Sequence, residues 1–231
     1  MINGITKIDI ISLYGNKSFS ITFKDNKFIL VGNTGSFKST ILNIVYAVLS
    51  GVPQLLRHND FGRIDITFRS GDRISISKDD FNDPDKFSKL CDALECRRDY
   101  KVKVHYITAT TQFVIKPRHF TDELYNMLDN YLFEISSKDI IQKVGYDGLS
   151  NGQKHLMTML YDLIIDKNHD HILVLDDPEA FLDVDIQKRI LDDISKMQNC
   201  AGLIAATHSP FIFDNDLDHS VHGVNEFEIV D

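Results

Sequence analysis

A glycine-rich stretch carries the first residues that could do chemistry. Residues 31–40 read VGNTGSFKST, which fits the pattern GxxxxGK[ST] except that Phe37 stands at the second glycine. In that pattern backbone N–H groups and a helix N-terminus face phosphates, while a lysine reaches the terminal oxygens and a hydroxyl binds Mg²⁺. The sequence therefore predicts a phosphate cradle made by Gly32, Asn33, Thr34, Gly35, Ser36, Phe37, Lys38, Ser39 and Thr40.

Phe37 changes the geometry of this cradle without removing a donor. Glycine at that position frees the bend of a β-carbon, so phenylalanine needs an unstrained φ or incurs a small energetic cost. Its side chain must also point away from the phosphates.

Two acidic residues follow a second apolar run, HILVLDDPE. A carboxylate at the end of a buried strand can hold magnesium through water, which is the role expected for Asp176. Asp177 directly after it is the expected base for an attacking water. A strand that ends in solvated acids is the alternative, and the phosphate cradle upstream makes it the weaker one.

A third motif, Leu149-Ser150-Asn151-Gly152-Gln153, precedes an amphipathic stretch, and Ser150 is a suitable helix cap. At this point the chain resembles the ABC-type ATPases, whose LSGGQ signature it matches in four of five positions. In that family the signature receives the γ-phosphate of ATP bound to the other subunit. The resemblance therefore implies ATP and Mg²⁺ as cofactors and an ATP-dependent homodimer, with the signature residues Ser150, Asn151, Gly152 and Gln153 binding nucleotide.

The resemblance continues in the same order along the chain. AFLD, which ends at Asp183, is similar to the D-loop, and ATHSP supplies His208 as the switch histidine that senses the γ-phosphate. Gln112 corresponds to the Q-loop glutamine that bridges magnesium and water. These correspondences imply Lys38, Asp177 and His208 as catalytic residues and Ser39, Asp176 and Gln112 as the metal ligands.

The opening strands and the forms DDPEAFLD and THSP are similar to the SMC, RecF and OLD-type ATPases. No sustained heptads occur between Lys38 and Ser150, so the long coiled-coil arms of SMC proteins are not expected. Only residues 209–231 follow His208, which leaves no room for the nuclease domain of OLD proteins. We expect a bare ATPase head: one ABC-type domain over residues 1–231 in two lobes, with the signature helix region at about 120–168.

The apolar patterns supply the elements that must position these motifs. Strands are expected at 5–12, 18–23, 27–32 and 101–107, a hairpin at 62–78, and buried strands at HILVLDD and GLIAATH. Helices are expected after the glycine loop, after Thr121, after the signature, and from Val184 to Met197. The predicted fold class is α/β: a P-loop NTPase with ABC-ATPase head topology, in which helices flank a mostly parallel core sheet and an antiparallel β lobe is added.

The composition of the chain limits which classes of partner we expect it to bind. A net charge of -9 over 231 residues argues against a nucleic-acid platform, although the short basic runs at 101–103 and 116–118 and the pair Arg97 and Arg98 leave local DNA contact open. Three cysteines without CxxC spacing indicate neither a disulfide framework nor a zinc site. The N-terminus has no signal-peptide pattern and no apolar run reaches the length of a membrane span, so we expect a cytoplasmic protein without a membrane partner.

Three functions remain open from the sequence. The first is a soluble ATPase that regulates a separate effector, such as a nuclease or toxin in phage (antiviral) defence or DNA maintenance. The second is a nucleotide switch that seldom hydrolyses ATP, because Phe37 and Asp177 depart from the family pattern. The third is the ATP-binding subunit of a membrane transporter. Asp177 replaces a glutamate and is one methylene shorter, so slow hydrolysis is expected.

Overall fold

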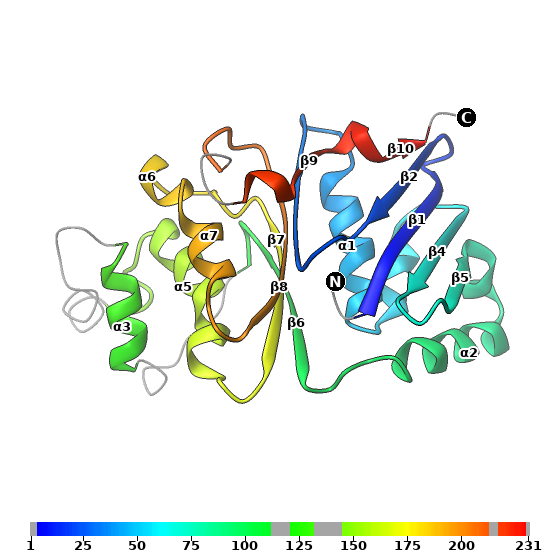
Figure 1. Cartoon of the computed structure of the whole chain (residues 1–231), viewed down its shortest axis with the longest axis horizontal. Coiled ribbons are helices and arrows are strands. Elements are labelled where there is room, and N and C mark those ends of the chain that lie inside the picture. The colour runs from blue at the N-terminus through cyan, green and yellow to red at the C-terminus, as the bar shows by residue number, and fades with distance from the viewer. Residues whose placement is uncertain (1–3, 112–120, 132–144, 213–216, 230–231) are drawn as a thin grey trace.

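The computed structural model describes residues 4–111, 121–131, 145–212 and 217–229. Within these ranges the chain forms two five-stranded sheets, one parallel and one antiparallel, with helices packed between and beside them (Figure 1). This is the α/β architecture expected from the sequence, with a parallel core sheet and an antiparallel β lobe.

The antiparallel sheet has the strand order β10-β2-β1-β4-β5. Its strands are β1 (Ile5–Leu13), β2 (Lys17–Thr22), β4 (Arg63–Phe68), β5 (Arg73–Ser77) and β10 (Glu228–Ile229). The predicted hairpin is β4 and β5, which pair with Ile64 opposite Ile76 and Ile66 opposite Ile74. Alternating isoleucines thus place one apolar face of this lobe against the rest of the molecule.

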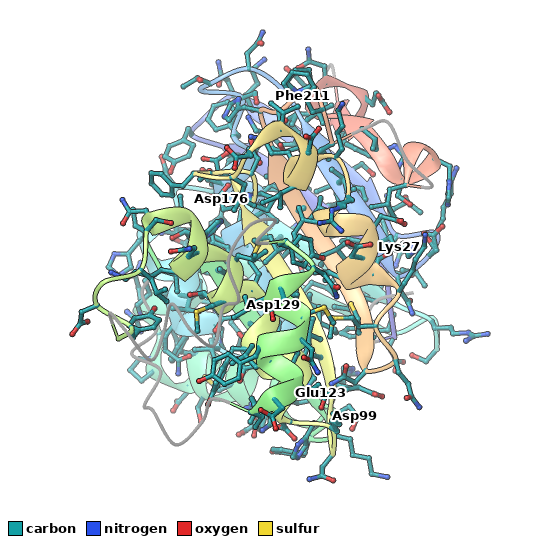
Figure 2. All side chains as sticks on the ribbon, turned by 90° about the vertical axis from the view of Figure 1, so that its left-hand side faces the viewer. Lys27, Asp99, Glu123, Asp129, Asp176 and Phe211 are labelled. Atoms are coloured by element: carbon teal, nitrogen blue, oxygen red, sulfur yellow. The ribbon has the colours of Figure 1, made fainter. Side chains whose placement is uncertain are left out.

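The parallel sheet has the order β6-β7-β8-β3-β9. Its strands are β3 (Lys27–Val31), β6 (Val102–Thr108), β7 (Asp170–Asp176), β8 (Cys200–Thr207) and β9 (Val221–Gly223). Since all five strands run the same way, the glycine loop, the paired acids and the THSP turn leave the sheet at one edge. Figure 2 shows this edge from the side, with Asp176 and Phe211 toward one end of the molecule and Asp99 and Glu123 at the other.

Helices cover both faces of the parallel sheet. The helices of the described ranges are α1 (Lys38–Leu49), α2 (Pro84–Glu95), α3 (Asp122–Asp129), α5 (Asn151–Ile165), α6 (Val184–Gln187) and α7 (Ile190–Ser195), of which α2 lies beside the antiparallel sheet (Figure 1). Short 3-10 turns occur at Pro53–His58, Lys78–Asn82, Asp218–Ser220 and Val224–Phe227. Helix α1 and the β lobe lie on one face, and α3, α5 and α7 lie on the other (Figure 1). No helix in the described ranges combines the length and the apolar character that crossing a bilayer needs.

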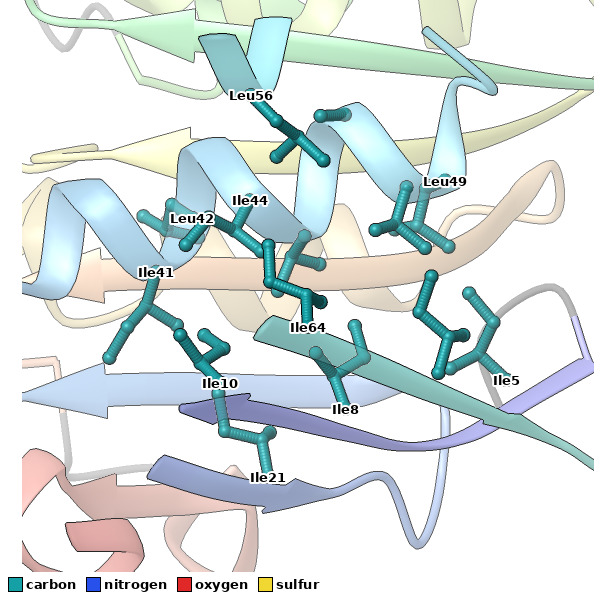
Figure 3. Packing of buried hydrophobic residues seen from close by; sticks show 14 of the residues in the cluster. Ile5, Ile8, Ile10, Ile21, Ile41, Leu42, Ile44, Leu49, Leu56 and Ile64 are labelled. Carbon is teal, nitrogen blue, oxygen red and sulfur yellow. The ribbon is translucent and has the colours of Figure 1, made fainter. Parts of the chain in front are cut away.

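Strand β7 shows how the sequence divides the core. Ile172 and Val174 belong to the apolar cluster around α1, whereas Leu173 and Leu175 belong to the cluster around α5. Such period-two alternation inside a continuous apolar run is typical of a parallel strand that is covered on both faces. The side chains of α1 and those of β1, β2 and β4 interlock in the first cluster (Figure 3).

A partly buried polar cluster connects α5 to the sheet. His105 on β6 lies 3.1 Å from a carboxylate oxygen of Asp162 on α5, and its Nε2 lies 2.9 Å from Nδ1 of the fully buried His171. Burial raises the pKa of Asp162, but the hydrogen bond from His105 and the charges of His105, His171 and Lys103 outweigh burial and lower the pKa overall. Asp162 is therefore held in its ionised form.

Two features differ from the sequence-based expectation. The helix predicted from Val184 to Met197 is divided into α6 and α7, because Arg189 has a non-helical backbone. Its guanidinium lies 4.4 Å from the centre of the Tyr131 ring and donates to the carbonyl of Asn130, so contacts with the end of α3 accompany the break. Strands β9 and β10 were not expected from the sequence.

Candidate functional site

The glycine loop forms a cradle between β3 and α1. Gly35 has a φ of 83° and Phe37 a φ of 68°, so left-handed residues bend the chain before the helix begins at Lys38. Bends of this kind turn successive backbone N–H groups toward a common centre, which is the anion-binding geometry predicted from the sequence. Asn33, Thr34 and Gly35 form the exposed rim of this cradle.

Phe37 adopts the left-handed conformation that glycine would take at no cost. For another residue that conformation costs about 1–2 kcal/mol. The Phe37 ring packs on the core of the β lobe, stacking on Tyr14 with 5.7 Å between ring centres and lying 6.1 Å from Phe19. Of the two alternatives that the sequence left open, the structure has the strained φ with its energetic cost, and aromatic packing compensates for the strain.

Lys38 is buried at the base of the cradle, with only 4% of its surface exposed. Its Nζ donates to the carbonyls of Gly32 at 2.7 Å and Asn33 at 3.2 Å and lies 3.0 Å from Nε2 of His208. Burial lowers the pKa of Lys38, while the carboxylates of Asp177, Asp176 and Glu179 oppose that shift. Lys38 and His208, 170 residues apart in the sequence, thus share one site.

An acidic corner, formed by Ser39, Tyr106 and Asp176, adjoins the cradle. The Ser39 hydroxyl donates to Asp176 Oδ1 at 3.1 Å, and the Tyr106 hydroxyl donates to Asp176 Oδ2 at 3.4 Å. Burial raises the pKa of Tyr106, and the charge of Asp176 and the hydrogen bond to it raise this pKa further. The phenol therefore remains a hydrogen-bond donor. Tyr106 was not found from the sequence, where it reads as an ordinary strand residue.

The chemistry of this corner fits magnesium. Burial raises the pKa of Asp176, the neighbouring Asp177 raises it further, and the hydrogen bond from Ser39 partly offsets both. A divalent cation would relieve this repulsion. Mg²⁺ keeps several waters and binds through one or two protein carboxylates, and this corner offers one hydroxyl and one carboxylate. Ser39 and Asp176 would hold it; Gln112, the third expected ligand, lies outside the described residues.

Asp177 follows in a constrained loop. Its φ is 53°, its N–H donates to the carbonyl of Ala206 at 2.9 Å, and the next residue is Pro178. Helical dihedrals are disfavoured for a residue that precedes proline. Pro178 and the hydrogen bond to Ala206 therefore both restrict the backbone of Asp177. The carboxylate lies close enough to Lys38 and Asp176 to shift the pKa of each.

The signature begins α5 with a reciprocal cap. Gln153 N–H donates to Ser150 Oγ at 3.2 Å, and Ser150 N–H donates to Gln153 Oε1 at 2.8 Å. The sequence-based expectation that Ser150 caps this helix is confirmed. Ser150 and Asn151 are exposed at the edge of the molecule.

Gly152 has no room for a side chain. A β-carbon there would lie 2.4 Å from the carbonyl oxygen of Phe181 in the AFLD segment, so the signature and this segment touch backbone to backbone. Phe181 itself has a φ of 64° and is 60% exposed. Asp183, at the start of α6, is exposed, and its side chain makes no cap hydrogen bond to that helix.

His155, one turn further along α5, is a second residue that sequence reasoning missed. It is 3% exposed, and neither ring nitrogen has a hydrogen-bond partner among the described residues. Burial lowers its pKa, while weak hydrogen bonding with the backbone of Pro178 and Asp177, outside the geometry of a regular hydrogen bond, and the charge of Glu179 oppose that shift. A neutral imidazole therefore lies behind the loop that carries the paired acids.

The chain has the features of an ABC-like P-loop ATPase head. Its parallel sheet is covered on both faces, and the cradle, the paired acids, the signature and the turn at residues 207–210, here called the switch turn, lie along one edge of that sheet. Solved structures agree. The chain is similar to the SmcHead bound to the C-winged helix domain of ScpA, with a TM-score of 0.56 and 15% identity over 92% of each chain. It is also similar to the SMC head domain from Thermotoga maritima, with a TM-score of 0.52 and 14% identity over 95% of this chain and 94% of the other. At these identities the likeness shows the fold.

A family model assigns the chain more narrowly. Residues 98–214, just over half of the chain, match the model described as "AAA domain, putative AbiEii toxin, Type IV TA system". The chain belongs to this family. A comparison with curated protein sequences found no significant match.

Proposed function

We propose that the chain binds Mg-ATP, dimerises head to head when ATP is bound, and uses binding and hydrolysis to regulate a separate effector protein. The observation that carries the proposal is the contact between Ser39 Oγ and Asp176 Oδ1 at 3.1 Å, which joins the cradle to the acidic strand end. Lys38 and His208 meet on the same cradle at 3.0 Å. For one bound triphosphate, Lys38 would supply a cation, Ser39 and Asp176 would hold the metal ion, and His208 would sense the terminal phosphate.

The placement of the signature supports a dimer. Helices α1 and α5 pack on opposite faces of the parallel sheet (Figure 1). The cradle at the start of α1 and the signature at the start of α5 are therefore on opposite sides of the sheet. Phe181, Val184 and Phe211, which flank the D-loop and switch segments, are large apolar side chains that remain exposed. In the proposed dimer a second head would cover these side chains.

The effector is proposed from the family. Its description names a putative AbiEii toxin and a type IV toxin–antitoxin system, and we extend to this chain the idea of an ATPase paired with a toxin or nuclease in phage defence or DNA maintenance. The net charge of -9 makes a protein effector a better partner than bare nucleic acid.

Titration calorimetry with Mg-ATP tests the nucleotide site. Lys38→Ala should abolish binding, because it removes the side-chain cation of the cradle, whereas the exposed Lys24→Ala should bind as the parent does. Near-normal affinity in Lys38→Ala would refute the assignment of the cradle.

Light scattering with and without ATP tests the dimer. Ser150→Arg should bind ATP as a monomer but fail to dimerise, while Ser70→Arg, in the exposed turn of the β4–β5 hairpin, should dimerise normally. Equal dimerisation of both variants would remove the signature from the interface.

A second candidate, a nucleotide switch with little turnover, is favoured by the constrained Asp177. A carboxylate displaced by about 1 Å can lose about a hundredfold in rate. Asp177→Glu should then raise turnover, and Asp177→Ala should accumulate an ATP-bound dimer. Parental turnover in Asp177→Ala would show that this carboxylate is not the base.

A further inference from the structure

Glu179 reaches from the loop after β7 to the backbone of the switch turn. Its Oε1 accepts hydrogen bonds from the N–H groups of His208 at 2.9 Å and Ser209 at 3.1 Å. The Ser209 N–H also donates to Thr207 Oγ1 at 2.9 Å. One carboxylate oxygen thus holds two successive peptide groups at the point where β8 ends.

Gln187 on α6 makes a second connection to the same turn. The Ser209 hydroxyl donates to Gln187 Oε1 at 2.7 Å, and Gln187 Nε2 donates to the carbonyl of Leu182 at 2.7 Å. Residues 177–187, which include the D-loop, are therefore joined to the switch turn at two places. This arrangement belongs to a single chain and needs no second subunit.

The hydrogen bonds of Glu179 also limit what its carboxylate can do. Oε1 is engaged by backbone donors, and Oε2 is buried with no hydrogen-bond partner in the described part of the chain. A general base must reach the water from which it takes a proton, but two backbone N–H groups occupy Oε1 of Glu179 and Oε2 is buried. Its position instead decides where the peptide of His208 lies, and the His208 ring faces Lys38 at 3.0 Å.

We infer that Glu179 is a positioning residue: it clamps the backbone of the switch turn so that His208 stays over Lys38 and the terminal phosphate. The inference rests on the proposed ATPase function for its kinetic consequence, although the clamp itself is a property of the fold. Because the contact uses an oxygen acceptor, an amide in place of the carboxylate can maintain it, which separates positioning from proton transfer.

The test compares Glu179→Gln with Glu179→Ala in steady-state ATP hydrolysis. Glu179→Ala frees the turn, and misplacement of His208 by about 1 Å should lower kcat about a hundredfold with KM for ATP within about threefold of the parent. Glu179→Gln should retain kcat within about fivefold, because its amide oxygen still accepts from both N–H groups. An equal loss in the two variants would overturn the inference in favour of a base, and parental kcat in Glu179→Ala would overturn it outright.

Amide hydrogen exchange supplies a readout that does not depend on turnover. Exchange at His208 and Ser209 should rise at least about tenfold in Glu179→Ala and stay near the parental rate in Glu179→Gln. Glu123→Ala, which removes a largely exposed carboxylate from α3, should change neither kcat nor this exchange. If the parent lacks ATPase activity, the proposed function fails while the exchange still decides the clamp; unchanged exchange in Glu179→Ala would refute it.

Discussion

Replacement of Phe37 by glycine and by alanine would separate backbone strain from packing in the phosphate cradle. Both changes remove the partly buried ring, together with its contacts to Tyr14 and Phe19. Burial of half a phenylalanine and two ring contacts are together worth roughly 2–3 kcal/mol. Glycine then recovers about 1 kcal/mol, because a φ of 68° carries no β-carbon penalty for it, whereas alanine keeps the penalty.

We therefore expect the free energy of unfolding to fall by about 1–2 kcal/mol in Phe37→Gly and by about 2–3 kcal/mol in Phe37→Ala. For a chain of this length 1 kcal/mol corresponds to about 2–4 °C in Tm, so the glycine variant should melt about 2–4 °C above the alanine variant. Thermal and urea unfolding followed by circular dichroism measure both values.

The matched control lies in helix α1, which begins directly after Phe37. Asn43 is exposed within α1, where alanine should be more stable than glycine by about 1 kcal/mol, the reverse order. Affinity for Mg-ATP should stay within about threefold of the parent in Phe37→Gly, because the backbone donors are unchanged. If Phe37→Ala proves as stable as Phe37→Gly, the left-handed strain assigned to this position does not exist.

Three further changes test other parts of the structure. Gly152→Ala should lower the free energy of unfolding by about 1–3 kcal/mol in urea titrations, because its methyl group would meet the Phe181 carbonyl at 2.4 Å. The change Asn151→Ala, at an exposed position, is the control, and an unchanged urea midpoint in Gly152→Ala would contradict the contact. His155→Leu should raise Tm, since two unpaired buried ring nitrogens cost about 1–3 kcal/mol, and a lower Tm would mean that the ring is hydrogen-bonded. The pKa of Asp162 lies below its ordinary value of 3.8, so its stabilisation is present above that pH and disappears as pH falls through the lowered pKa. Asp162→Asn should accordingly be less stable than the parent at pH 7, with a difference that shrinks in acid, and a difference independent of pH would refute the coupling.

The sequence predicted those parts of the site that depend on local pattern. The cradle, the acids at the end of β7 and the cap at Ser150 are each defined by residues within ten positions of one another, and periodicity placed the strands before them. Non-local contacts could not be anticipated. Glu179 bonds to backbone groups 29 and 30 positions away, and Tyr106 meets Asp176 across 70 positions. The division between α6 and α7 likewise coincides with an Arg189–Tyr131 contact that no helical pattern records.

The strand order of the parallel sheet also constrains how the protein is made. Strand β3, which leads into the cradle, ends at Val31, yet its neighbours β8 and β9 are the strands at Cys200–Thr207 and Val221–Gly223. A ribosome that adds about 5–20 residues per second needs roughly 10–35 s to travel from the end of β3 to the end of β8. Throughout that interval the glycine loop has been synthesised but has no sheet to hold it. A nascent chain therefore lacks a formed cradle until β8 has been synthesised, and nucleotide can stabilise only a head whose parallel sheet has assembled.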